Sequence, residues 1–216
     1  MDSCELLQRA ATCIDVELDR RALSLMARYV GLVMVWRAKV NLVSVTNEEE
    51  FVIDHVVDSL TVLRFIAAGS SVVDVGSGAG LPGVPLKVAD PSLALTLVEA
   101  RRRRVFFLRE VIRQLGLRRV EALWGRMEPG QGGVVAGRTF DVAVARGVGG
   151  VGYVASIAAP VLRTGGRLVL MRGPSGEAEW REESSRLGRL FSLGSIERLR
   201  LPVSGKPRVL LLLERL

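Results

Sequence analysis

Apolar residues recur three and four positions apart through the first 67 residues, a spacing that places them on one face of a helix. Thr46 and Asn47 are good helix caps, and the acidic residues that follow them suit the positive end of a helix. We therefore expect a helical N-terminal part over residues 1–67. Its helices are expected at 6–14, 19–41 and 51–67.

The pattern changes after Gly69. Short apolar runs rich in β-branched residues then alternate with segments of helical period, which favours an α/β fold with a mostly parallel, doubly wound sheet. Residues 68–216 are expected to form one compact domain, to which residues 1–67 add a helical cap. The expected strands are 72–75, 93–98, 120–123, 140–145 and 167–171, the expected helices are 84–89, 102–115, 151–162 and 178–190, and further apolar stretches lie at 191–203 and 208–214.

The charge of the chain narrows the classes of partner. Its 216 residues include 30 basic and 23 acidic side chains, a formal net charge of +7, and all but three of the basic residues are arginines. This balance fits a polyanionic partner, although an arginine bias also follows from genomic base composition. No apolar run approaches the roughly 18 residues that cross a bilayer. Two cysteines and one histidine are too few for a zinc site, so we expect no bound metal. We also expect a monomeric cytoplasmic protein that does not bind a membrane.

A glycine-rich segment, Asp74-Val75-Gly76-Ser77-Gly78-Ala79-Gly80, lies between a predicted strand and a predicted helix. Its glycines let the backbone turn tightly and bring N–H groups close to a ligand at the start of the helix. Glu99 ends the next predicted strand, where its carboxylate can accept hydrogen bonds from ribose hydroxyls. The arrangement predicts a site for an adenosine-type cofactor, with Gly76, Gly78, Gly80 and Glu99 as candidate residues.

Two cofactors compete for this loop. Residues 78–83 fit the GxGxxG pattern of dinucleotide-binding proteins, so a nicotinamide-dependent oxidoreductase stays open. Asp74, just before the first glycine, favours S-adenosylmethionine, because that ligand has a positive amino acid end and no pyrophosphate for the helix to neutralise. We expect S-adenosylmethionine.

Further motifs, taken with the glycine loop, resemble one family, the bacterial 16S rRNA guanine-N7 methyltransferases (RsmG, also called glucose-inhibited division protein B). The similarity covers roughly residues 20–175 and fades over 176–216, and Gly-Leu-Pro-Gly-x-Pro-Leu at 80–86 is its most specific part. The other motifs are Asn41-Leu42, His55-x-x-Asp58-Ser59-Leu60, Arg104-Val105-x-Phe107-Leu108, Gly125-Arg126-Met127-Glu128, Ala145-Arg146 and Met171-Arg172-Gly173-Pro174.

The resemblance implies a Rossmann-like methyltransferase that modifies N7 of one guanine in small-subunit rRNA near the decoding region. Its cofactor residues, carried over by position, are Gly76 and Leu81 in the pocket, Met127 and Glu128 by the adenine, Glu99 at the ribose, and Arg146 facing cofactor and substrate. This chain departs from the family at two places: Asp54 stands where an arginine is usual, and Arg172 where a lysine is usual.

Methylation at guanine N7 needs no general base, because the N7 lone pair lies in the ring plane and carries no proton at neutral pH. Catalysis is then expected to come from proximity and orientation. Arg146 and Arg172 follow predicted strands, where open sheets place ligands, and an arginine fork can read N7 and O6 of guanine. A plain ion pair for Arg146 is equally open.

The remaining candidates have simpler interpretations. The run 101–104 opens a helix, where positive charge opposes the dipole, so RNA contact by Arg103 and Arg104 and a merely solvated face are both open. His55 and Asp58 are expected to brace the glycine loop or a neighbouring helix. Trp36 and Trp124 are expected in the core.

Three other functions remain open at this stage. A small-molecule methyltransferase of the same fold would ignore RNA, a nicotinamide-dependent oxidoreductase would bind NADH, and a non-catalytic assembly factor would bind rRNA without turnover. The expected partner is 16S rRNA, in the small ribosomal subunit or in an assembly intermediate.

Overall fold

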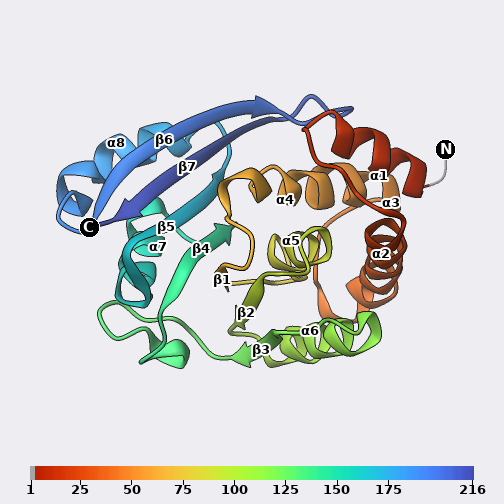
Figure 1. Cartoon of the computed structure of the whole chain (residues 1–216), viewed down its shortest axis with the longest axis horizontal. Coiled ribbons are helices and arrows are strands. Elements are labelled where there is room, and N and C mark those ends of the chain that lie inside the picture. The colour runs from red at the N-terminus through yellow and green to blue at the C-terminus, as the bar shows by residue number, and fades with distance from the viewer. Residues whose placement is uncertain (1–2) are drawn as a thin grey trace.

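The computed structural model describes residues 3–216. Its centre is a seven-stranded sheet in the order β3-β2-β1-β4-β5-β7-β6 (Figure 1). Neighbouring strands among β1 to β5 are parallel, and β7 runs antiparallel to both β5 and β6. The expected α/β fold with a mostly parallel sheet is confirmed. The strands are β1 (Ser71–Val75), β2 (Ala94–Glu99), β3 (Val120–Trp124), β4 (Phe140–Arg146), β5 (Leu162–Arg172), β6 (Phe191–Arg200) and β7 (Pro207–Arg215).

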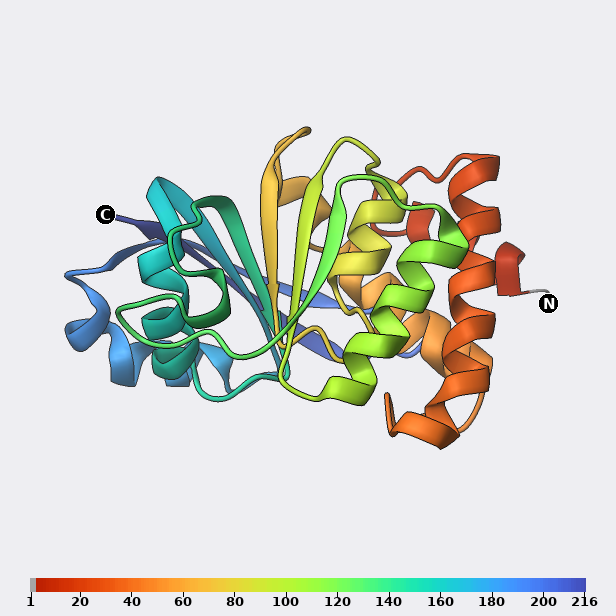
Figure 2. The same ribbon diagram turned by 90° about the horizontal axis from the view of Figure 1, so that it is seen from below.

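Helices cover both faces of the sheet (Figure 2). One face carries α5 and α6, with α2 packed outside them, and the other face carries α7 and α8. Successive strand residues alternate between the two cores, so that Val72 belongs to the first and Val73 to the second. The helices are α1 (Ser3–Thr12), α2 (Arg20–Val40), α5 (Gly83–Ala89), α6 (Arg102–Leu115), α7 (Val151–Ala158) and α8 (Gly176–Leu187).

The N-terminal helices pack into the first core. Asp19 caps α2 by accepting a 2.7 Å hydrogen bond from the Ala22 N–H, and Asn41 ends the helix in a left-handed conformation. Apolar residues of α1 and α2 share one cluster with α5, α6 and the sheet. The division of the chain into residues 1–67 and 68–216 stays a prediction.

The expected continuous helix at 51–67 is wrong. The chain forms α3 (Glu48–Phe51), a π-helical segment (Val52–Val57), α4 (Asp58–Leu60) and a 3-10 turn (Leu63–Phe65). The carbonyl oxygens of Asp54 and His55 lie 3.4 Å from Nη1 of Arg146. A side chain that competes for helix carbonyls widens the turn, and apolar periodicity carries no sign of such a distant competitor.

The C-terminal third also departs from the expected boundaries. The helix expected at 151–162 ends at Ala158, and a 3-10 turn (Ala159–Val161) leads into a β5 longer than expected. The two apolar stretches near the C-terminus pair as the β6–β7 hairpin. In the part of the chain that the structure describes, every helix is too short or too polar to cross a membrane.

Candidate active site

The loop between β1 and α5 is built from glycines in left-handed conformations. Gly76 has a φ of +69°, and a methyl group on it would lie 2.5 Å from Cγ2 of Val148, so a larger residue would displace its neighbour. Two backbone hydrogen bonds also hold the loop in place. The Ser77 N–H donates to the Val98 carbonyl at 3.0 Å, and the Leu81 N–H donates to the Ser77 carbonyl at 2.9 Å.

Asp74 lies in β1 just before this loop and is fully buried. Its Oδ2 accepts a 2.9 Å hydrogen bond from the Gly83 N–H, while Oδ1 has no partner among the described residues. Burial raises the pKa of Asp74 to about 7, although the hydrogen bond from Gly83 opposes this shift. The carboxyl of Asp74 therefore holds the start of α5 against the end of β1 from inside the protein.

Glu99 ends β2 and connects the loop to α6. Its Oε2 accepts from the Gly78 N–H at 3.0 Å and its Oε1 accepts from the Arg101 N–H at 2.7 Å. The guanidinium of Arg104 lies 3.9 Å from Oε2. Each carboxylate oxygen has more than one lone pair, so Glu99 can still accept hydrogen bonds from ligand hydroxyls.

A cavity of about 200 Å³ opens beside Gly76. Met127 also lines it, so the structure brings together two of the predicted cofactor residues. Leu81 is buried in the first core, and Glu128 is exposed. Val75, Gly125 and Arg126 line it too and belong to the motifs quoted above, although none was predicted as a cofactor residue. The lining residues outside those motifs are Val98, Ala100, Val148, Tyr153 and Ile157. Mostly apolar walls with a glycine-rich floor fit a flat heterocycle.

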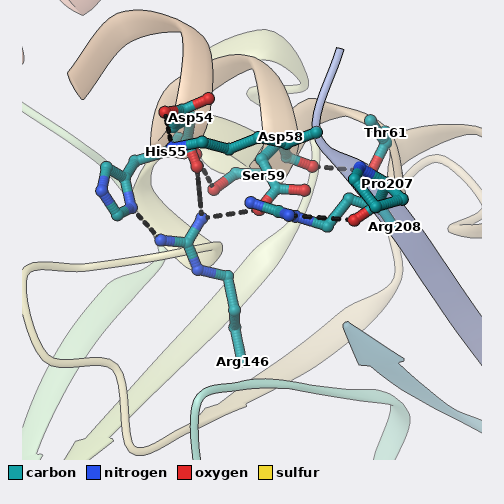
Figure 3. Close-up of polar contacts among 9 residues, drawn as sticks. Asp54, His55, Asp58, Ser59, Thr61, Arg146, Pro207 and Arg208 are labelled. Atoms are coloured by element: carbon teal, nitrogen blue, oxygen red, sulfur yellow. Dashed lines mark hydrogen bonds and ion pairs between the residues drawn. The ribbon is translucent and has the colours of Figure 1, made fainter. Parts of the chain in front are cut away.

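Arg146 ends β4 and reaches across to the broken helix (Figure 3). Its Nη1 lies 3.0 Å from Oδ2 of Asp58, and its Nη2 contacts Nδ1 of His55. The same Nη1 approaches the two carbonyl oxygens of the π-helical segment. His55 and Asp58, predicted to brace nearby structure, therefore hold the guanidinium of Arg146.

The pKa shifts of the groups around Arg146 fit a guanidinium that is held in one place. Burial and the neighbouring Arg146 charge lower the pKa of His55 to about 4, so its imidazole is neutral near pH 7 and Nδ1 can accept from Arg146. Burial raises the pKa of Asp58, while Arg146 and Arg208 oppose that shift. Because His55 is a weak base here, the cluster orients a guanidinium and is unsuited to accepting protons.

Two cations next to and within β7 complete the network. Nζ of Lys206 lies 2.6 Å from Oδ2 of Asp54, and Nε of Arg208 lies 3.1 Å from Oδ2 of Asp58. Figure 3 shows Arg208 approaching Asp58 from the strand side. The partners are separated by 152 and 150 positions in the chain, so no local sequence signal could have found them. Asp54, where the family usually has arginine, is thus ion-paired.

A second hollow, of about 280 Å³, lies where β4 and β5 end and β7 begins. Arg146, Arg172 and Arg208 line it. Nη1 of Arg172 donates to the Gly149 carbonyl at 2.7 Å and so holds the segment that follows β4. Gly147 lines this hollow and Val148 lines the cavity beside Gly76. Consecutive residues of the segment after β4 therefore line the two cavities, which lie next to each other along this segment.

The arginine run divides by environment. Arg103 is exposed, while Nη2 of Arg104 donates to the Asn41 carbonyl at 2.6 Å. RNA contact by either residue stays a prediction. The core position expected for Trp124 is wrong, because its side chain is 56% exposed where β3 ends at the sheet edge. Trp36 is partly buried and packs against Phe107 with ring centroids 5.8 Å apart.

Comparison with known proteins identifies the relatives of this chain. The sequence model of one family, described as GidB, rRNA small subunit methyltransferase G, matches residues 22–206. The chain is 34% identical over 97% of its length to the ribosomal RNA small subunit methyltransferase G of Syntrophotalea carbinolica, 96% of which is covered. It is 37% identical to the protein of the same name from Caldanaerobacter subterraneus, over 79% of this chain and 72% of that protein.

Solved structures agree on the fold. A SAM dependent methyltransferase from Aquifex aeolicus superposes with a TM-score of 0.56 at 18% identity, covering 74% of this chain and 90% of that one. An rRNA methylase from Streptococcus thermophilus gives 0.52 at 17% identity, covering 72% and 92%. Among residues 3–216, no three His, Cys, Asp or Glu side chains are grouped to hold a metal ion. The comparisons give no support to a nicotinamide-dependent oxidoreductase, and the chain belongs to the rRNA small subunit methyltransferase G family.

Proposed function

We propose that this chain transfers the methyl group of S-adenosylmethionine to N7 of a guanine in 16S rRNA. The observation that carries the proposal is that consecutive residues, Gly147 and Val148, line an apolar cavity beside Gly76 and an arginine-lined hollow, in a chain of this family. We further propose that the protein acts as a monomer in the cytoplasm, on rRNA, the small subunit or an assembly intermediate.

The residues beside the glycine loop fit the cofactor. The backbone at Gly76 and the side chain of Met127 would enclose the adenosine, and Glu99 would accept from the ribose. When bound, S-adenosylmethionine supplies a methyl carbon on a positively charged sulfur, which the N7 lone pair attacks while the carbon–sulfur electrons leave with sulfur.

The arginine hollow would receive the guanine. Arg146 is held by Asp58 and His55 before any ligand arrives, so its orientation costs little at the moment of reaction. A guanidinium that donates to O6 leaves the adjacent N7 free to face the cofactor. No residue need remove a proton first, in keeping with the lowered pKa of His55, about 4.

A small-molecule substrate is the weaker alternative. The formal net charge of +7 and the three arginines around the hollow favour a polyanion that carries the base. A non-catalytic rRNA binder would have little use for a second cavity that fits the cofactor.

The test is transfer of a labelled methyl group from S-adenosylmethionine to 16S rRNA and to small subunits that lack the modification, with digestion to nucleosides. We expect label in 7-methylguanosine at one site. Cofactor binding with label only in small molecules would favour the alternative, and cofactor and RNA binding without turnover would favour an assembly factor. No cofactor binding would remove the methyltransferase proposal altogether.

A further inference from the structure

Two exposed aromatic rings and an arginine lie together where β3 and α6 meet. The guanidinium carbon of Arg102 is 5.5 Å from the ring centroid of Phe106 and 5.4 Å from that of Trp124. Phe106 is 49% exposed and Trp124 is 56% exposed. We call Arg102, Phe106 and Trp124 the stacking platform.

The platform is fixed in place beside the cofactor-side cavity. The Nε1–H of Trp124 donates to the Ala100 carbonyl at 3.1 Å, which sets the plane of the indole. Ala100 and Gly125, the residue after the tryptophan, both line the cavity of about 200 Å³. A group stacked on the indole would therefore lie at the rim of that cavity.

The charges around the platform have no internal explanation. Helix α6 begins with Arg102 and Arg103, has no acidic residue in its first turn and no side-chain cap, although cations there oppose the helix dipole. Arg101, Arg102 and Arg103 are all exposed. The two rings that contact Arg102 also leave about half of their surface exposed to water. An anionic and flat ligand would gain from both features.

Single-stranded RNA has this chemistry. Its bases stack on aromatic and guanidinium planes, and its phosphates pair with arginines. A protein partner could also cover aromatic rings, but the cluster of exposed arginines with no acid in the first turn of the helix favours the polyanion.

We propose that the stacking platform binds one unpaired base of the substrate RNA, at a position flanking the methylated guanine. The inference rests on the proposed function and adds to it a second contact point. Strand β3 is three strands from β4 in the sheet, about 14 Å at the usual strand spacing of about 4.8 Å. The platform therefore holds a neighbouring nucleotide rather than the guanine beside Arg146.

The test measures RNA affinity separately from methyl transfer. Anisotropy of a fluorescein-labelled, single-stranded oligoribonucleotide from small-subunit rRNA gives the Kd for the wild type, Trp124→Ala, Phe106→Ala and Trp124→Phe. We expect each alanine variant to raise the Kd about tenfold, the usual cost of one lost base–aromatic stack, and Trp124→Phe to restore most of the affinity. The dependence of Kd on salt is expected to be unchanged in these variants, because no charge is lost.

The charged member of the platform has a matched control. Arg64, just before β1, lies 4.7 Å from the ring of Phe65 and also 3.6 Å from Glu197 of β6, the edge strand opposite β3. Arg102→Gln is expected to weaken RNA binding and to reduce the salt slope by about 0.7, the value for one phosphate contact on a single strand. Arg64→Gln is expected to change neither.

The outcomes separate this inference from the proposed function. Unchanged Kd values in the alanine variants, or failure of the wild type to bind the RNA, would overturn the platform. The platform would also be overturned if the alanine variants lost affinity for intact subunits but kept full affinity for naked RNA, since the platform would then bind a ribosomal protein. Methyl transfer by the wild type tests the proposed function independently, and in the variants we expect a higher KM for RNA with unchanged kcat.

Discussion

The two cavities at the ends of the central strands are lined by different kinds of chemical group. Around Gly76 the walls are mostly backbone and apolar side chains, and the decisive geometry comes from left-handed glycines. Around Arg146 the walls are charged side chains that pair across the fold, from the π-helical segment to β7. The cavity beside Gly76 thus depends on backbone geometry, whereas the arginine hollow depends on ion pairs between residues that are distant along the chain.

The difference teaches where each side is vulnerable. A backbone site fails when a side chain is added, because the space is already filled to contact distance. A buried ionic site fails when a side chain is removed, because the remaining partner keeps an uncompensated charge. Tyr29 connects the two sides: its hydroxyl donates to the Ala79 carbonyl at 3.0 Å, and its ring lies 5.9 Å from that of Phe51, which contacts His55.

The largest expected effect is on the arginine side. Arg146→Ala leaves Asp58 with Arg208 as its sole cationic partner among the described residues, and we expect a loss of about 3 kcal/mol in the free energy of unfolding. Misplacement of the base should also lower kcat/KM for methyl transfer about 100-fold. Urea unfolding and labelled methyl transfer measure the two losses.

A double variant separates these losses. Arg146→Gln with Asp58→Asn removes this ion pair but leaves Arg208 without its carboxylate, so we expect only part of the stability to return while methyl transfer stays low. Recovery of activity together with stability would make Arg146 a structural residue alone.

The cofactor side should respond to an added methyl group. Gly76→Ala and Gly69→Ala each place alanine at a positive φ, which costs about 1 to 2 kcal/mol of stability, and at Gly76 the contact with Val148 adds to that cost. At Gly69 nothing lies within 4 Å of the new carbon, so this variant is the control for backbone strain. We expect Gly76→Ala alone to weaken S-adenosylmethionine binding at least tenfold in calorimetric titration; equal affinities would place the cofactor elsewhere.

The two sides should also differ in the sign of their pH dependence. His55 has a pKa lowered to about 4, so its contribution to stability is present above its unfolded pKa near 6.5 and is lost as the pH falls towards 4. Asp74 has a pKa raised to about 7, so its contribution is present below its unfolded pKa near 3.9 and is lost as the pH rises through 7.

Difference measurements isolate each titration. Relative to the wild type, Asp74→Asn should gain unfolding free energy as the pH rises from 4 to 7, and His55→Gln should lose its relative advantage over the same range. We expect changes of opposite sign, about 4 kcal/mol for Asp74→Asn and about 3 kcal/mol for His55→Gln over the full range, with urea unfolding at several pH values as the measurement. Slopes of the same sign would contradict the assigned environments.

The smallest expected effect is at the connection between the sides. Tyr29→Phe keeps the ring against Phe51 but removes the donor to the Ala79 carbonyl, so stability should fall by about 1 kcal/mol. Tyr153→Phe, at a tyrosine 47% exposed, should stay within about 0.5 kcal/mol of the wild type. A loss of methyl transfer beyond the loss of cofactor affinity would show that Tyr29 also supports the arginine side.

Sequence patterns predicted what is local. The sheet, the glycine loop and the acid at Glu99 follow from periodicity and from glycines at fixed spacing. The π-helical segment and the pairing of Asp58 with Arg208 could not be predicted, because their causes lie in residues distant along the chain. Trp124 was misplaced because a tryptophan at a strand end reads as apolar, while its exposure depends on what the neighbouring strand leaves uncovered.

The pairing of Asp58 with Arg208 has a consequence for biosynthesis. The two residues are 150 positions apart, so the N-terminal partner is made long before its cation exists. At synthesis rates of about 5 to 20 residues per second, the interval is on the order of ten seconds. During that time the glycine loop and its surrounding helices can already fold, whereas the arginine hollow cannot close. We therefore expect a nascent chain to acquire cofactor affinity before it can engage its substrate, an order that limited proteolysis of stalled translation complexes can measure.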